Sequence, residues 1–237
     1  MVINKNRIFV GLILILSILI FYYFKLDLFF FSLITLGIFY EIYKSGLLTA
    51  KKLLVLIFFY LLSFLIYINI NISIYIFIFL ILVAFFVTLF FSKYVKISFA
   101  FFLCILSIII FSLFTQSRDT VYLIILLSFI NDTFAFLFGN FLKGPLIVPN
   151  ISPKKTWTGT TISSVISFSI LIFYNFSYLA AIILSILLFL GDIYFSFIKR
   201  KLSIKDFSNI LSGHGGILDR LDSMSFLFIA FALFNLI

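Results

Sequence analysis

The 237-residue sequence is 65% hydrophobic and 11% charged, and its 17 basic and eight acidic residues give a net charge of +9. Soluble domains are about half apolar and a quarter charged, and disordered chains are poor in hydrophobic residues, so both classes are excluded. Since a membrane-spanning helix takes about 20 residues, at most about eleven helices would fit, without a sizeable soluble domain. Stretches such as 72–91 are apolar on every face, which favours helices over alternating barrel strands.

Polar breaks divide the chain into nine candidate spans of an all-α, polytopic membrane bundle. The spans are expected over 8–24, 28–43, 53–68, 72–92, 97–115, 120–138, 159–176, 178–198 and 217–237. Composition separates a nearly featureless hydrophobic region, 1–130, from a region, 131–237, that contains all three prolines, the single Trp and the single His. We expect one membrane domain whose second region carries the chemistry.

The basic residues set the expected orientation. With the N-terminus in the cytoplasm, fourteen of them fall in cytoplasmic connections: Lys5, Arg7, Lys44, Lys51, Lys52, Lys93, Lys96, Lys143, Lys154, Lys155, Lys199, Arg200, Lys201 and Lys205. Lys25 and Arg118 fall on the other side, and Arg220 lies within the last span. This bias predicts nine spans with a cytoplasmic N-terminus, in the inner (cytoplasmic) membrane of a cell. Proximity to anionic lipid then explains the net charge better than nucleic-acid binding does.

Five acids lie within or beside the expected spans, all near their cytoplasmic ends: Glu41, Asp132, Asp192, Asp219 and Asp222. An unpaired charge inside a membrane costs about 2.5–3.5 kcal/mol on insertion scales, so such residues need polar partners. Five acids on the same side therefore predict one polar cavity that opens to the cytoplasm.

Helical spacing groups several of these residues. Asp219 and Asp222 are three residues apart and share a helix face, while Asp192, Ser196 and Lys199 form one stripe. Carboxylates beside lysines suit Mg²⁺ that carries a polyphosphate, because Mg²⁺ commonly binds one or two carboxylates together with substrate phosphates. A structural ion-pair network of Asp219, Arg220 and Asp222 is an equally good explanation of the last motif.

Two loops could hold phosphate. Ser212-Gly213-His214-Gly215-Gly216 leads into the last span, where free helix amides attract anions, but a glycine-rich segment can also be a simple turn. In it, a positioning role is favoured for His214. Ser152-Pro153-Lys154-Lys155-Thr156-Trp157 combines two lysines with hydroxyls, yet lysines beside Trp also anchor membrane proteins at the interface.

Together these motifs resemble the signature of the phosphatidate cytidylyltransferases, also called CDP-diacylglycerol synthases. The resemblance comprises Ser196-Phe197-Ile198-Lys199-Arg200, then Lys205-Asp206, and the unbroken segment from His214 to Ser223. The 152–157 loop with Gly159, the pair Gly191-Asp192 and the pair Asp132-Thr133 also match, so the likeness is dense over about 131–223. The sequence departs from the usual pattern at Phe134, Phe195 and Ser212.

The resemblance implies that CTP and phosphatidate react to give CDP-diacylglycerol and diphosphate, in a homodimer that binds no nucleic acid. It implies Mg²⁺, alone or with a second cation, on Asp192, Asp219 and Asp222. Further catalytic groups would be Lys199, Arg220 and His214. Substrate contacts would come from Asp132, Ser152, Lys154, Lys155, Thr156, Ser196, Arg200, Lys205, Gly215 and Gly216.

Two other functions are compatible with parts of this pattern. The acceptor could be another lipid phosphate, such as an ether-linked phosphatidate, since the headgroup chemistry would be identical. The chain could instead be a transporter, whose polar groups should extend through the full depth of the membrane. Here the acids gather on one side, which disfavours transport.

Overall fold

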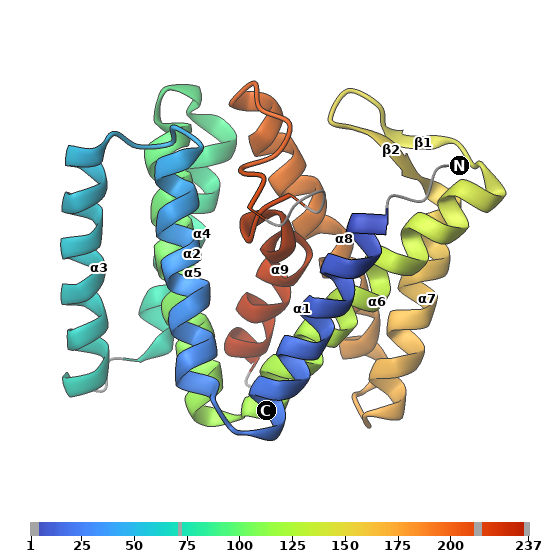
Figure 1. Ribbon diagram of the computed structural model, residues 1–237, viewed down its shortest axis with the longest axis horizontal. Helices are drawn as coiled ribbons and strands as arrows, with labels where there is room; N and C mark the ends of the chain where they lie inside the picture. The colour runs from blue at the N-terminus through green and yellow to red at the C-terminus, as the bar shows by residue number, and fades with distance from the viewer. Residues whose placement is uncertain (1–4, 71–72, 211–214, 235–237) are drawn as a thin grey trace.

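The computed structural model describes residues 5–70, 73–210 and 215–234, and their side chains apart from those of 5–12, 70 and 154. Within these ranges the chain forms nine α-helices, one short 3₁₀ helix and two strands (Figure 1). The helices are α1 (Lys5–Tyr23), α2 (Asp27–Lys44), α3 (Ala50–Ile70), α4 (Ile74–Phe90), α5 (Val95–Gln116), α6 (Arg118–Leu142), α7 (Trp157–Phe173), α8 (Tyr178–Lys201) and α9 (Leu218–Phe234). The 3₁₀ helix η1 is Ser92–Tyr94, and the strands are β1 (Leu146–Val148) and β2 (Ser152–Thr156).

The all-α membrane fold is confirmed. In the part of the chain that the structure describes, four helical segments are long and apolar enough to cross a membrane: Ala50–Asn69, Ser92–Gln116, Arg118–Leu142 and Tyr178–Lys201. The other helices with described side chains are shorter and include apolar examples such as Ile74–Phe90. Every expected span coincides with a helix, whereas nine membrane crossings and their orientation stay predictions.

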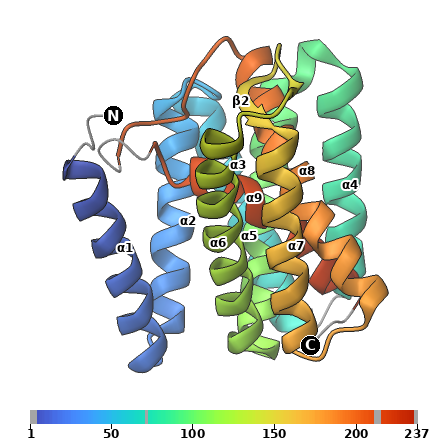
Figure 2. The same ribbon diagram turned by 90° about the vertical axis from the view of Figure 1, so that its right-hand side faces the viewer.

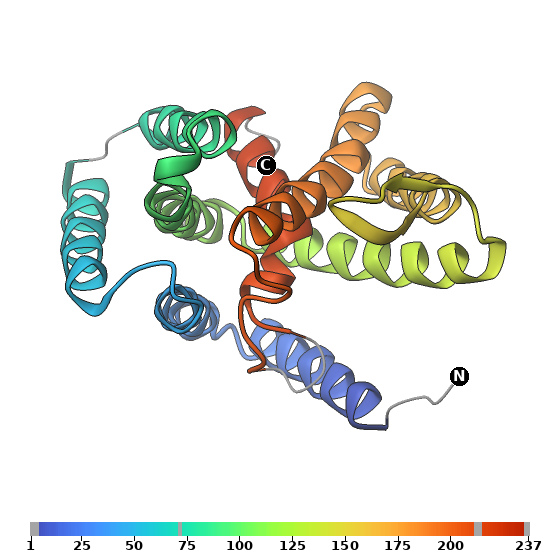
Figure 3. The ribbon, with the colours of Figure 1, turned by 90° about the horizontal axis from the view of Figure 1, so that it is seen from above.

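Helix α5 lies among α2, α4 and α9, and α3 stands at the edge of the bundle (Figures 1 and 3). Most side chains of α5 are buried, from Val95 to Phe114, by packing against α4, α9 and α6. Helix α3 instead exposes large apolar side chains, among them Leu54 and Phe58. A helix face with many exposed apolar side chains is typical of a surface that contacts lipid.

The connections alternate between the two ends of the bundle. The α2–α3, α4–α5, α6–α7 and α8–α9 connections lie at one end, and the others lie at the opposite end (Figures 1 and 2). The first end is called the basic end, because most of the lysines and arginines expected in the cytoplasm lie in these connections or in the helix turns beside them. Basic side chains link neighbouring segments at this end: Lys96 Nζ donates to Gly46 O (3.4 Å), and Lys201 Nζ donates to Thr88 O (3.0 Å).

The α6–α7 connection forms a small antiparallel hairpin, which was not predicted from the sequence. Strands β1 and β2 pair Leu146 with Thr156 and Val148 with Ser152, with an irregularity between the two pairs. The hairpin lies at the basic end, beside the ends of α6 and α7 (Figures 1 and 2). It therefore presents the lysine-containing segment as a strand with defined neighbours.

Helices α8 and α9 approach closely where Gly191 faces the first turns of α9. A Cβ atom at Gly191 would lie 2.5 Å from Asp222 O and 3.4 Å from Ser223 O. We therefore expect Gly191→Ala to push α9 away and to lower the free energy of unfolding by about 1–3 kcal/mol. The thermal midpoint in detergent should fall by about 2–4 °C per kcal/mol. Ser185→Ala on α8 is the control, since its hydroxyl donates to Ile182 O (2.9 Å) within the same helix. An unchanged midpoint for Gly191→Ala would contradict the prediction.

Candidate active site

Three carboxylates from three helices lie within electrostatic range of one another inside the bundle. Asp132 of α6, Asp192 of α8 and Asp222 of α9 lie close enough to interact electrostatically, and Asp222 is 7% exposed. Ser223 joins two of them: its amide donates to Asp222 Oδ1 (2.9 Å), and its hydroxyl donates to Asp132 Oδ2 (3.5 Å). The structure thus brings together acids that are up to 90 residues apart, here named the carboxylate trio.

Basic side chains surround the carboxylate trio. Lys155 of β2 forms an ion pair with Asp192, and Lys199 of α8 interacts with Asp192 and Asp222. Arg220 of α9 acts electrostatically on Asp132. Such an arrangement of cations and carboxylates is suited to an anionic ligand that arrives with its own metal ion, because each added charge then meets an opposite one.

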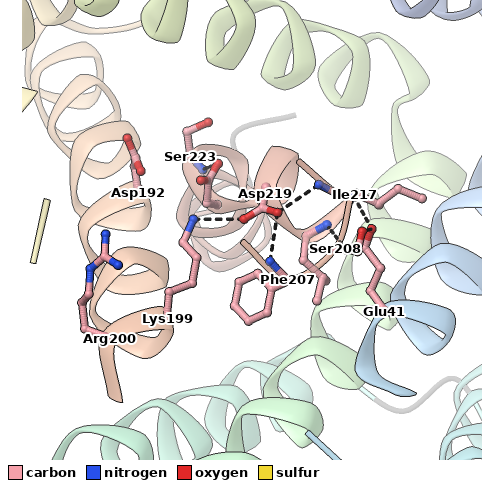
Figure 4. A network of polar contacts seen from close by, with 12 residues as sticks. Glu41, Asp192, Lys199, Arg200, Phe207, Ser208, Ile217, Asp219 and Ser223 are labelled. Carbon is pink, nitrogen blue, oxygen red and sulfur yellow. Dashed lines mark hydrogen bonds and ion pairs between the residues drawn. The ribbon is translucent and has the colours of Figure 1, made fainter. Parts of the chain in front are cut away.

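Hydrogen bonds to the Asp219 carboxylate hold the loop before α9 in place (Figure 4). Its Oδ1 accepts a hydrogen bond from Lys199 Nζ (3.0 Å), and its Oδ2 accepts from the amides of Phe207 (3.2 Å) and Gly216 (2.9 Å). Although Asp219 and Asp222 share the first turns of α9, they therefore have different surroundings. Lys199 links the two, since it contacts Asp219 and also interacts with the carboxylate trio.

Glu41 of α2 holds the same loop from its other side (Figure 4). The sequence predicts Glu41 in the polar cavity with the other four acids but suggests no binding or catalytic role for it. This fully buried carboxylate accepts hydrogen bonds from Ser208 Oγ (2.7 Å), Ile217 N (2.6 Å) and Leu218 N (2.8 Å). Two of these donors are amides at the start of α9, where the helix dipole stabilises a negative charge. The only signal in the sequence was the cost of an acid in an apolar span.

The two described glycines of the His-Gly-Gly motif make room for these carboxylates. Gly215 has φ +77°, and a Cβ there would lie 2.8 Å from Asp219 Oδ2. A Cβ at Gly216 would overlap both Glu41 Oε1 and Ser208 Oγ. The close approach that the glycines permit is thus made by protein carboxylates, and phosphate binding by Gly215 and Gly216 stays a prediction.

The hairpin residues have structural contacts of their own. Thr156 is the N-cap of α7, because its Oγ1 accepts a hydrogen bond from Gly159 N (3.3 Å). Arg200 Nε donates to Ile151 O (3.0 Å) and ties the end of α8 to the hairpin. These contacts explain how the segment that carries Lys155 is held against α8.

The other predicted substrate contacts are less closely grouped. Ser152 begins β2, Ser196 is buried on α8, and Lys205 is exposed in the α8–α9 connection. The side chain of Lys154 and the whole of His214 lie outside the described residues. Roles for all five in substrate binding or catalysis remain predictions.

The carboxylate trio offers only part of the coordination shell that a metal ion needs. Within the described residues there is no group of three or more His, Cys, Asp or Glu side chains placed to hold one. The carboxylate trio nevertheless supplies hard oxygen donors, and Mg²⁺ needs only one or two of them when phosphates complete its coordination. The donor set therefore fits a cation bound jointly with a polyphosphate better than a preformed protein cage.

The fold and the site define a class: an all-α membrane protein in which acids and lysines converge inside a helical bundle. The sequence pattern of the cytidylyltransferase family matches residues 5–237, so the chain belongs to that family.

Relatives include the phosphatidate cytidylyltransferases of Rickettsia typhi, 34% identical over 47% of this chain and 58% of that protein, and of Aquifex aeolicus, 40% identical over 46% and 44%. A chloroplastic phosphatidate cytidylyltransferase of Arabidopsis thaliana is 42% identical over 47% of this chain and 31% of its own length. The chain spans about half the length of the curated relatives it matches.

Proposed function

We propose that this protein transfers the cytidylyl group of CTP to phosphatidate, which gives CDP-diacylglycerol and diphosphate. Membership of the cytidylyltransferase family and the names of the relatives support this reaction. The observation that carries it is the convergence of Asp132, Asp192 and Asp222 with Lys155 and Lys199. Such a site can neutralise two phosphate-containing substrates at once.

The chemistry needs positioning more than proton transfer. A phosphatidate oxygen, already anionic, forms a bond to the α-phosphorus of CTP while the bond from that phosphorus to the bridging oxygen breaks, and diphosphate leaves with the electron pair. No general base is required for this step. The barrier is mainly the repulsion between two anions, so oriented cationic groups supply most of the catalysis.

We assign roles to the residues on this basis. Lys155, Lys199 and Arg220 bind phosphate oxygens, and Asp192 and Asp222 bind Mg²⁺, alone or with a second cation. When bound, the cation would supply further charge neutralisation at the phosphates. Asp219 belongs to the same proposal: a phosphate that draws Lys199 away would free Asp219 Oδ1, which now accepts from Lys199.

The membrane arrangement completes the proposal. Nine spans and a cytoplasmic N-terminus would put the basic end at the inner face of the cytoplasmic membrane, where CTP is available. The lipid substrate would reach the carboxylate trio from within the bilayer. A homodimer is proposed from the family resemblance alone.

The deciding assay uses the purified protein in detergent with labelled CTP, phosphatidate and Mg²⁺, and it measures label in the lipid fraction. We expect labelled lipid only when phosphatidate and Mg²⁺ are both present. Equal labelling without phosphatidate, or none with all components and verified folded protein, would overturn the proposed reaction.

Lys155→Ala is expected to raise the KM for CTP by about tenfold or more, because a charge-assisted contact to phosphate is lost and Asp192 loses its partner. Lys93→Ala, at an exposed lysine of the same end of the bundle, should leave KM unchanged. Steady-state kinetics with varied CTP measure both. An unchanged KM together with an unchanged kcat in Lys155→Ala would remove Lys155 from the site.

A further inference from the structure

Phe207, in the α8–α9 connection, contacts both members of the Lys199–Asp219 ion pair. Its backbone amide donates a hydrogen bond to Asp219 Oδ2 (3.2 Å). Figure 4 shows its ring beside the side chain of Lys199, and the Lys199 Nζ lies 5.8 Å from the ring centroid, within the range of a cation–π interaction. One residue therefore holds the carboxylate through its main chain and the ammonium group through its side chain.

Lys199 is shared between two groups of acids. Its Nζ donates to Asp219 Oδ1 (3.0 Å), and it also interacts electrostatically with Asp192 and Asp222 of the carboxylate trio. Because a lysine ammonium group sits on a flexible stem of four carbons, charge alone does not fix its position. The face of an aromatic ring attracts an ammonium group but carries no net charge. The ring therefore restrains Lys199 without neutralising the charge that a substrate phosphate requires.

Aromatic packing fixes the ring of Phe207, whose side chain is almost fully buried. The ring stacks on Phe99 of α5, with centroids 5.5 Å apart and planes at 17°, and it meets Phe195 of α8 at 6.2 Å and 83°. Phe99 and Phe195 are fully buried and contact each other at 5.2 Å. A ring enclosed in this way has little freedom to turn, so it can hold Lys199 in one place.

The loop that carries Phe207 is held by bonds that do not involve the ring. The bond to Asp219 comes from the Phe207 main chain, and the hydroxyl of the next residue, Ser208, donates to Glu41 Oε1 (2.7 Å). Replacing the ring therefore leaves the hydrogen bonds of the loop in place. The effect of the ring on Lys199 can be separated from the effect of the loop on α9.

We propose that Phe207 is a positioning residue for cytidylyl transfer. Its ring keeps the Lys199 ammonium group beside the carboxylate trio when a substrate phosphate replaces Asp219 as the partner of Lys199. The inference rests on the proposed function and adds to it an apolar residue that acts through Lys199.

Phe207→Leu tests the inference, because it removes the aromatic face and keeps both an apolar side chain and the amide donor to Asp219. We expect kcat per folded protein to fall by about tenfold, while the KM for CTP stays within about twofold of wild type. Lys199 retains its charge in this variant, so CTP is still attracted, but the ammonium group loses its orientation at the reacting phosphate. A wild-type kcat in Phe207→Leu would overturn the inference.

Phe102→Leu is the matched control. Phe102 is fully buried on α5 and packs against Phe99 and Phe195, on the side of the same aromatic group away from the Lys199 contact. The substitution should lower the thermal midpoint through lost packing and leave kcat per folded protein near wild type. Equal losses of kcat in Phe102→Leu and Phe207→Leu would show that only packing matters and would overturn the inference.

A second measurement needs no turnover. An amine-reactive acetylating reagent is added to the purified protein, and the modified fraction of Lys199 is followed over time by peptide mass spectrometry, with the exposed Lys93 as the reference. We expect Lys199 to react about threefold faster or more in Phe207→Leu and at the wild-type rate in Phe102→Leu. Equal rates in wild type and both variants would overturn the inference. If wild-type protein transfers no cytidylyl group, the proposed function fails, and the labelling rates still decide whether Phe207 holds Lys199.

Discussion

Asp222→Asn is expected to reduce cytidylyl transfer by about 10²–10³-fold, as is typical when one electrostatic contact to a transition state is removed. The amide oxygen of asparagine can still accept the Ser223 amide hydrogen bond (2.9 Å), so the local structure should persist. The substitution also removes one of three carboxylates that repel one another. The thermal midpoint should therefore stay the same or rise while activity is lost.

Lost activity with an unchanged or higher thermal midpoint would indicate that Asp222 binds a ligand. If Asp222 belonged to a structural ion pair, its substitution would lower the thermal midpoint. Activity and the thermal midpoint are to be measured on the same detergent-solubilised sample over a range of Mg²⁺ concentrations. Asp27→Asn is the control for the loss of a carboxylate: Asp27 begins α2 at the end of the bundle opposite the basic end, so activity should remain. Near-normal activity of Asp222→Asn at all Mg²⁺ concentrations would exclude Asp222 from the cation site.

The helices follow closely from the sequence, because apolar length and polar breaks dominate membrane folding. The span expected over 159–176 is α7, which begins two residues earlier because Thr156 caps it. The hairpin β1–β2 gave no comparable signal. Its strands are three and five residues long, and their pairing depends on tertiary position rather than on a local hydrophobic pattern.

From the sequence, it could be predicted which acidic residues need polar partners, but not which residues those partners are. The cost of acids in apolar spans predicted one cavity shared by five acids. The structure groups only Asp132, Asp192 and Asp222, whereas Glu41 and Asp219 hold the loop before α9. The spacing of Asp219 and Asp222 predicts that they share a helix face. It does not predict that Lys199 and two loop amides donate hydrogen bonds to the Asp219 carboxylate. Periodicity defines a face of a helix, whereas its neighbours depend on how the helices pack.

Glu41 shows the same limit over a longer separation in sequence. Its partner Ser208 is 167 residues away, and its other donors are backbone amides, which have no signature in the sequence. The contact connects α2, in the region 1–130, to the start of α9, in the region 131–237. The division of the chain at 130 stays a prediction, but the second region depends on the first for the support of its loop.

Glu41→Gln should reduce kcat by about 10–100-fold, because the amide nitrogen of glutamine cannot accept a hydrogen bond and at least one buried donor loses its partner. Leu218 N, Ile217 N and Ser208 Oγ all donate, so no orientation of the glutamine amide satisfies the three. Since Asp219 and Asp222 follow directly in α9, a shift of this helix start would displace both. The measurement is kcat at saturating substrates, well below the thermal midpoint of the variant.

Two further variants approach the same contact from its other side. Gly216→Ala adds a methyl group that overlaps Glu41 Oε1 and Ser208 Oγ, so it should reproduce the loss of kcat. Ser208→Ala removes one donor and leaves both amide bonds to Glu41, so its effect should be much smaller. A loss of activity that merely follows the folded fraction of each variant would show that Glu41 supports the fold as a whole. A larger loss in fully folded protein, in the order expected here, requires that Glu41 positions α9 for the reaction.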